Sequence, residues 1–109
     1  MEEGLARAAE ALRVETLRVE ALRTAVSRLS RELAGHPAQL SDRSVAEDAL
    51  AELAAMAQSG APEVVRLRRA LLAVAGAVGS VSALAPSVGE LRKAVDLFGG
   101  EIPGPRGGD

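Results

Sequence analysis

Few side chains in this sequence are suited to catalysis or to metal binding. His36 is the only histidine, and it lies in the short segment Gly35-His36-Pro37. A lone histidine in a loop most often faces solvent or caps the preceding helix, because metal sites and proton relays need further ligands or partners nearby. We therefore predict no catalytic or metal-binding role for His36.

Three carboxylates lie close together in the sequence, at Glu47, Asp48 and Glu52. Bundles that hold two metal ions combine such carboxylates with Glu-x-x-His pairs, and the sequence contains no such pair. Ser44 and Glu47 have the spacing of a capping box, which gives Glu47 a structural role at the start of a helix. No nucleophile-elbow, P-loop or His-Glu-x-x-His pattern occurs. The sequence predicts no catalytic residue, no metal ligand, no cofactor and no enzymatic activity.

The densest basic cluster consists of Arg66, Arg68 and Arg69. Nucleic-acid-binding surfaces combine a broad basic patch with aromatic side chains that stack on bases. Here Phe98 is the only aromatic residue and the formal net charge is −2. We expect the arginines on an exposed helix flank, paired with Glu63 or with the acids of the preceding helix, and we expect no nucleic-acid partner.

The composition indicates an all-α protein. Ala, Leu, Arg and Glu dominate the 109 residues, and they are the residues of long helices. A chain of this length is one domain by prior. The absence of cysteine excludes disulfides and thiolate chemistry. The first residues are acidic and no apolar segment follows them, which is unlike a secretory signal, so we expect a cytoplasmic protein.

Glycines, prolines and capping-box spacings divide the chain into four predicted helices. Gly35 is expected to stop the first helix as its C′ residue, the second helix is expected to end at Gly60, and Pro86 is expected to stop the third. Pro62 suits the first position of the third helix. Ser87 and Glu90 repeat the capping-box spacing for the fourth helix. The predicted helices are Gly4 to Ala34, Ser44 to Gly60, Pro62 to Ala85, and Ser87 to Phe98.

The connections between these helices are short, which favours a small antiparallel bundle with a long N-terminal helix. Residues 1–98 would form this single domain. Residues 99–109 are rich in Gly and Pro and are expected to be a disordered tail.

The long first helix has two apolar stripes. The first stripe has a heptad spacing and is broken only at Glu15; it contains Leu5, Ala8, Leu12, Val19, Leu22, Val26, Leu29 and Leu33. The second stripe lies on roughly the opposite side and contains Val14, Leu17, Ala21 and Ala25. Between the stripes, three pairs are spaced for i,i+3 ion pairing: Glu10 with Arg13, Glu15 with Arg18, and Glu20 with Arg23.

Two stripes are more than one edge helix needs. Either the helix is central and covered on both sides, or another chain meets the second stripe or the part of the helix that overhangs its shorter neighbours. The interface candidates on this helix are Val14, Leu17 and Ala21. Leu17→Glu is then expected to weaken assembly without unfolding the chain.

Residues 70–89 carry no charge. In the predicted third helix the large side chains share one face, and Ala73, Gly76, Ser80 and Ala83 form a groove of small residues on the other. Glycine inside a helix is costly, so close packing of the first helix or of a second copy is expected there. The same segment supports a membrane-associated alternative, although residues 70–85 span about 24 Å and a bilayer core is about 30 Å thick. A small ligand is a further alternative if Leu71, Val74 and Val78 line a pocket.

Three segments carry a resemblance to a known family: "AVSRLSRELAGHPAQL", "RLRRALLAVAGAVGSVSALAP" and "GELRKAVDLFG". Over about Thr24 to Gly99 the chain is similar to a family of short actinobacterial proteins of unknown function. The resemblance implies a small standalone helical protein in which residues 1–23 are a variable helical extension. It implies no activity, cofactor or catalytic residue.

The sequence thus favours a non-enzymatic module for helical protein-protein interaction or oligomerisation. The expected partner is a second copy, with a dimer favoured, or another helical protein. The alternative is a membrane-associated protein that uses residues 70–85.

Overall fold

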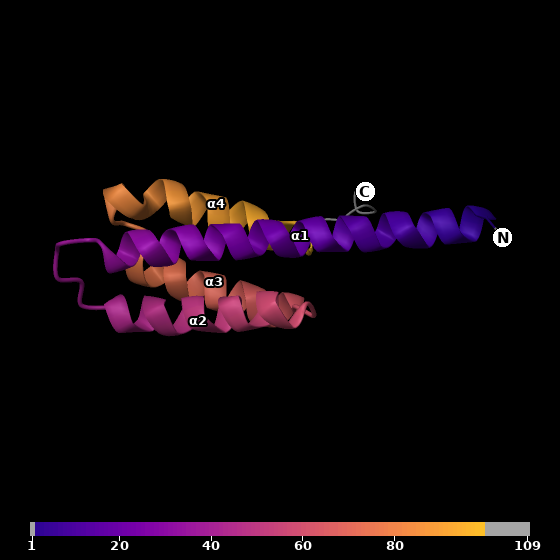
Figure 1. The fold of residues 1–109 in the computed structure, drawn as a ribbon. Coiled ribbons are helices and arrows are strands. Elements are labelled where there is room, and N and C mark those ends of the chain that lie inside the picture. Colours follow the sequence, from indigo (N-terminus) through magenta and orange to yellow (C-terminus); the bar gives the residue numbers. More distant parts are fainter. Residues whose placement is uncertain (1, 100–109) are drawn as a thin grey trace, which may run out of the picture.

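The computed structural model describes residues 2–99, and they form a four-helix bundle (Figure 1). Helix α1 spans Glu2–Ala34, α2 spans Arg43–Ser59, α3 spans Val64–Val78 and α4 spans Ala85–Asp96. A single 3-10 turn, η1 at Ser82–Leu84, leads directly into α4. The predicted all-α class and the long N-terminal helix are confirmed. The expectation of a disordered tail falls on residues 100–109, which lie outside the described residues, and on Gly99, which is described and buried.

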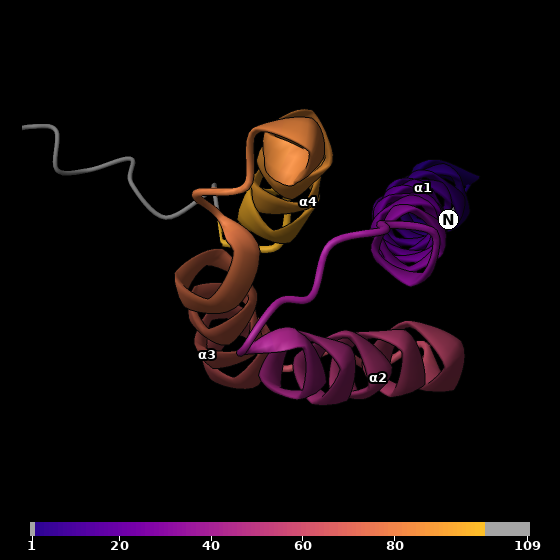
Figure 2. The same cartoon turned by 90° about the vertical axis from the view of Figure 1, so that its left-hand side faces the viewer.

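Successive helices run in opposite directions and lie at the corners of a square (Figures 1 and 2). Helix α1 packs against α2 and α4, and α3 packs against the same two neighbours. Helices α1 and α3 are therefore diagonal to each other, so α1 is covered on two sides and open on the others. This arrangement leaves two outer grooves along α1, one beside α2 and one beside α4.

The core contains the heptad residues from the second half of α1 and the large residues of α3. Leu22, Leu29, Leu53, Leu67 and Leu91 are fully buried. Burial of a leucine side chain stabilises the fold by about 2 kcal/mol. The other fully buried large side chains are Leu33, Leu84, Val74, Val78 and Val95. The predicted large face of the third helix is confirmed at Leu67, Leu71, Val74 and Val78, which all belong to this core.

Both predicted capping boxes are wrong. Helix α2 begins one residue before Ser44, and its N-cap residue Asp42 makes no side-chain capping bond. Ser87 lies inside α4, where it is buried and its hydroxyl donates a hydrogen bond to Glu32 of α1 at 2.5 Å. Because α4 begins at Ala85, Ser87 lies inside the helix and cannot cap it, and its hydroxyl instead donates to a carboxylate of a distant helix. The bond joins α4 to α1.

The predicted third helix is also wrong at its C-terminal end. Helix α3 ends at Val78, and the chain turns at Val81, which adopts an extended conformation. Pro86 does not stop a helix; it lies in the first turn of α4, where its missing N–H costs no hydrogen bond. The sequence predicts one helix across this turn because Val81 continues the large-residue face and Ser80 continues the small-residue face. Pro62 likewise precedes α3, whose N-cap residue is Glu63.

The C-terminus of α1 is capped by an arginine from the next helix. Gly35 does not adopt the left-handed conformation predicted for it, since Gly60 is the only glycine with positive φ among residues 2–99. Instead, Arg43 donates to the carbonyl oxygen of Leu33 at 2.5 Å and to that of His36 at 2.9 Å. A cation at this end also complements the helix dipole. Arg43 thereby fixes the loop between α1 and α2.

Candidate functional site: the exposed faces of helix α1

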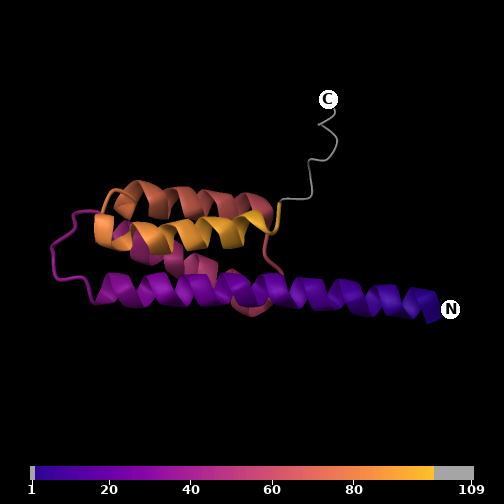
Figure 3. The same cartoon turned by 90° about the horizontal axis from the view of Figure 1, so that it is seen from above.

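The first part of α1 extends beyond the bundle without a neighbour (Figures 1 and 3). Residues 2–14, here called the overhang, are all exposed, and the first buried side chain of α1 is Val19. Thirteen residues make about 20 Å of helix. An isolated helix of this length is marginal in water, because helix stability in proteins comes mainly from packing of an apolar face. The overhang therefore lacks the cover that would stabilise it.

The overhang is amphipathic. Leu5 and Leu12, which continue the heptad stripe, are 72% and 70% exposed. Ala8 and Ala9 lie between them on the same side. The charged side chains Glu3, Arg7, Glu10 and Arg13 lie on the other sides, and Glu10 pairs with Arg13 at 3.1 Å. The predicted pairs of Glu15 with Arg18 and of Glu20 with Arg23 are also present, at 3.9 and 3.6 Å. The overhang thus presents an uncharged face with two leucines.

The outer groove between α1 and α2 is lined by small and mainly uncharged side chains. Three hollows of about 210, 260 and 180 Å³ follow one another along it from Leu12 to Leu33. Successive hollows share lining residues, Arg23 between the first two, and Ser30 and Ala54 between the last two. Glu15, Glu20 and Arg23 bring charge to the end of the groove near Leu12, and Glu47 brings charge to the other end. The middle of the groove is uncharged and is formed by Ser27, Ser30, Ala51, Ala54 and Gln58. A helix with an uncharged face matches such a surface.

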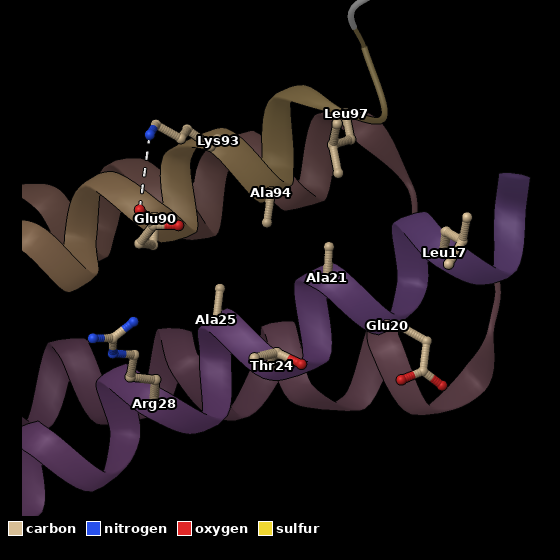
Figure 4. A pocket seen from close by; sticks show the side chains of 10 residues that line it. All are labelled: Leu17, Glu20, Ala21, Thr24, Ala25, Arg28, Glu90, Lys93, Ala94 and Leu97. Atoms are coloured by element: carbon tan, nitrogen blue, oxygen red, sulfur yellow. Dashed lines mark ion pairs between the residues drawn. The ribbon is translucent and has the colours of Figure 1, made fainter.

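The groove on the other side of α1, beside α4, contains the predicted interface residues. It has a volume of about 460 Å³. Figure 4 shows Ala21 and Ala25 of α1 directed toward Ala94 of α4, which forms the narrow floor. Leu17 and Leu97 lie at its open end and are 62% and 44% exposed. Its rim is charged, with Glu20 and Arg28 from α1 and Glu90 and Lys93 from α4.

The second apolar stripe of α1 is therefore divided between core and surface. Ala25 is buried and Ala21 is partly buried against α4, whereas Val14 is 39% exposed and Leu17 is more exposed still. The bundle does not conceal both stripes of α1.

The predicted small-residue groove of the third helix is not formed. Because α3 ends at Val78, Ser80 lies in a turn and Ala83 in η1, so neither continues the line of Ala73 and Gly76. Helix α1 does not cover this side, since it is diagonal to α3. At Gly79, a Cβ would collide with the carbonyl oxygen of Ala75, which explains the glycine there. At Gly76, a Cβ would meet nothing within 4 Å.

Two glycine substitutions are expected to act in opposite directions. Gly76→Ala should stabilise the fold by about 0.5–1 kcal/mol, because alanine is the better helix former and the site is open. Gly60→Ala should destabilise it by about 1 kcal/mol, because Gly60 ends α2 with φ of 74°. Urea unfolding of both variants measures the two effects. A destabilising Gly76→Ala would mean that a second copy packs closely on α3 in solution.

The side chains that the sequence offered as candidates for chemistry make structural contacts. The Nδ1 of His36 accepts a hydrogen bond from the backbone N–H of Ala38 at 3.3 Å. Arg66 pairs with Glu52 of α2 at 3.0 Å, as predicted for this cluster. Within residues 2–99, no three histidine, aspartate or glutamate side chains lie close enough to hold a metal ion.

Residues 70–85, which the membrane-associated alternative uses, do not form one helix, since α3 ends at Val78 and η1 follows at Ser82–Leu84. In the part of the chain that the structure describes, no helix combines the length and the apolar character needed to cross a bilayer.

The sequence reading missed the groove between α1 and α2. Its signal is weak, because Ser27, Ser30, Ala51 and Ala54 are ordinary residues for a helix surface. The spacing of Ala51, Ala54 and Gln58 shows that one side of α2 is small and uncharged, but only the packing of α2 on α1 turns this side into the wall of a groove.

Comparison with known proteins gives a family but no activity. The search of curated proteins and the search of solved structures gave no significant match. A family model described as "Family of unknown function (DUF5955)" matches residues 4–99. The match covers the bundle and also nearly all of the overhang, which the sequence resemblance had placed outside the shared part. The chain therefore belongs to the DUF5955 family of unknown function.

Proposed function

We propose that this protein is a cytoplasmic, non-enzymatic helical module that self-associates through α1, with a dimer as the assembly. One observation carries the proposal: the three most exposed leucines of α1, Leu5, Leu12 and Leu17, all lie in its N-terminal half, where the bundle gives little or no cover. Exposed apolar side chains grouped along one helix are typical of interaction sites.

Within α1, the absence of cover is specific to the N-terminal half. The second half of α1 buries its heptad residues against α2 and α4. The same helix then continues for 13 residues with leucines at the same spacing. A second helix packed along α1 would give these leucines the burial that Leu22 and Leu29 have inside the bundle.

The solution mass tests the proposal. At tens of micromolar protein we expect light scattering to give twice the 11.2 kDa of one chain. Glutamate at Leu5, Leu12 or Leu17 leaves the core intact, so at least one of these variants should become monomeric while keeping its helical circular dichroism. A monomeric wild type, or a dimer that survives all three substitutions, would contradict self-association through α1.

A further inference from the structure

We infer that two copies of this chain pair antiparallel along the whole of α1, with the overhang of each copy lying in the groove between α1 and α2 of the other. This inference rests on the proposed self-association and specifies its partner, its face and its alignment. In this pairing the overhang of each copy covers the groove of the other, and a two-fold axis relates the two equal contacts.

The overhang and the groove lie on the same side of α1. Each residue turns the helix by 100°, so the directions of side chains around the axis of α1 can be compared. The outward-facing side chains of this side point within about 40° of one common direction along the whole helix. Its N-terminal half carries Leu5, Ala9 and Leu12, and its C-terminal half carries Arg23, Ser27 and Ser30. An antiparallel partner on this side therefore brings leucines onto small residues, and the two-fold axis repeats the contact.

The groove is also long enough for the overhang. The overhang contains 13 residues, or about 20 Å of helix, and the hollows run beside α1 from Leu12 to Leu33, which is about 32 Å. With Thr16 and Leu17 at the two-fold axis, Leu5 lies between Ser27 and Ser30 of the second copy. Leu12 then lies between Val19 and Arg23, where the arginine stem offers further apolar contact. Both leucines become knobs in holes on the partner helix.

Charge complementarity selects the same alignment. Beside the apolar stripe, about 60–80° around the helix, are Glu2, Arg13, Glu20 and Arg31. The alignment that seats the leucines sets Glu2 opposite Arg31 of the second copy and Arg13 opposite Glu20. Within residues 2–99, neither Glu2 nor Arg31 forms an ion pair of its own. A shift by one helical turn would separate both pairs.

A parallel dimer on this side fits less well. Two parallel copies in register would set each overhang against the other overhang, and Arg23, Ser27 and Ser30 against the same residues of the second copy. The two Arg23 side chains would then lie close together, and the groove would not receive the leucines. The groove beside α4 fits the overhang less well. The side of the overhang that would enter it carries Glu3, Arg7 and Glu10, and its own rim is charged. The α2 side therefore offers the better partner for an apolar helix face.

Disulfide trapping tests this arrangement, because the chain has no native cysteine. The double variant Leu5→Cys, Ser27→Cys should form a covalent dimer on mild oxidation, since residues 5 and 27 of one chain are about 33 Å apart and cannot bridge internally. Leu5→Cys, Arg28→Cys is the matched control, because Arg28 lies on the α4 side; it should stay largely uncrosslinked. Leu5→Cys alone should also stay uncrosslinked, because the two copies of residue 5 are about 35 Å apart.

The outcomes separate this arrangement from the broader proposal. A dimeric wild type that gives a disulfide with Leu5→Cys alone, or with the Arg28 variant in place of the Ser27 variant, would overturn the alignment but not self-association. A monomeric wild type would overturn both. Small-angle scattering gives a second readout. Pairing along all of α1 gives a dimer about 60 Å long, close to the 58 Å of one chain, whereas contact through the overhangs alone gives about 95 Å.

A charge swap provides a matched readout without cysteines. Glu2→Arg should weaken the dimer roughly tenfold, because it places like charges opposite each other twice in the dimer. Adding Arg31→Glu should restore the affinity. Glu3→Arg makes the same change of net charge on the opposite side of the helix and should have little effect. Equal weakening by Glu2→Arg and Glu3→Arg would contradict the alignment.

Discussion

Leu12→Glu is expected to convert the dimer into monomers without unfolding the bundle. Leu12 is exposed in the single chain, so the carboxylate faces water there. In the dimer it would lie between helices, where loss of the leucine contact alone costs about 2 kcal/mol per copy. Because the two-fold axis repeats the change, the total of about 4 kcal/mol corresponds to a roughly thousandfold higher Kd. Sedimentation equilibrium over a range of concentrations measures this shift.

Leu17→Glu is the matched control for this experiment. It introduces the same charge five residues away, on the α4 side of the helix, where Leu17 is exposed beside Leu97. The second apolar stripe predicted that Leu17→Glu weakens assembly; the pairing on the α2 side replaces this expectation, and the Leu17 variant should remain mainly dimeric. If Leu17→Glu dissociates the dimer and Leu12→Glu does not, the interface lies on the side of Val14, Leu17 and Ala21 that the second apolar stripe indicates.

The largest effect on folding is expected for Leu29→Ala. Leu29 is fully buried in the half of α1 that lies between α2 and α4. Truncation of a buried leucine to alanine costs about 2–5 kcal/mol, through lost burial and the cavity left behind. Since small domains are stable by about 5–15 kcal/mol, a loss near 3 kcal/mol should lower Tm by more than 10 °C. Thermal unfolding followed by circular dichroism measures it.

Leu17→Ala is the control for this substitution. The same side chain is removed from the same helix at a position that is 62% exposed, so the change in unfolding free energy should stay within about 0.5 kcal/mol. Similar losses for both variants would show that Leu29 is less well packed than its burial indicates.

Some features of this protein are determined by the local sequence. The heptad spacing of Val19, Val26 and Leu33 predicts which side of α1 is buried, because helical geometry fixes the relative directions of residues seven apart. The i,i+3 pair of Glu10 with Arg13 follows from the same geometry. The all-α class follows from composition, since alanine, leucine, arginine and glutamate favour helices at every position.

The helix boundaries depend on contacts between distant helices, which a local sequence pattern does not show. Ser87 has the spacing of a capping residue, but its hydroxyl bonds to Glu32, 55 residues away. A proline such as Pro86 can stop one helix or begin the next. Here Leu84 and Val88 pack in the core, and this packing places Pro86 in the first turn of α4.

In the candidate site, too, some features follow from the sequence and others only from the tertiary structure. By itself the sequence determined that α1 carries more apolar surface than one face of a helix needs, because periodicity is an intrinsic property of the helix. Only the tertiary structure decided which of these residues stay exposed. The short α2 and α4 end before residues 2–14 of α1, and α2 packs beside Ser27 and Ser30 to form a groove. The physical reason is that exposure and grooves are properties of neighbouring helices, which a single segment cannot specify.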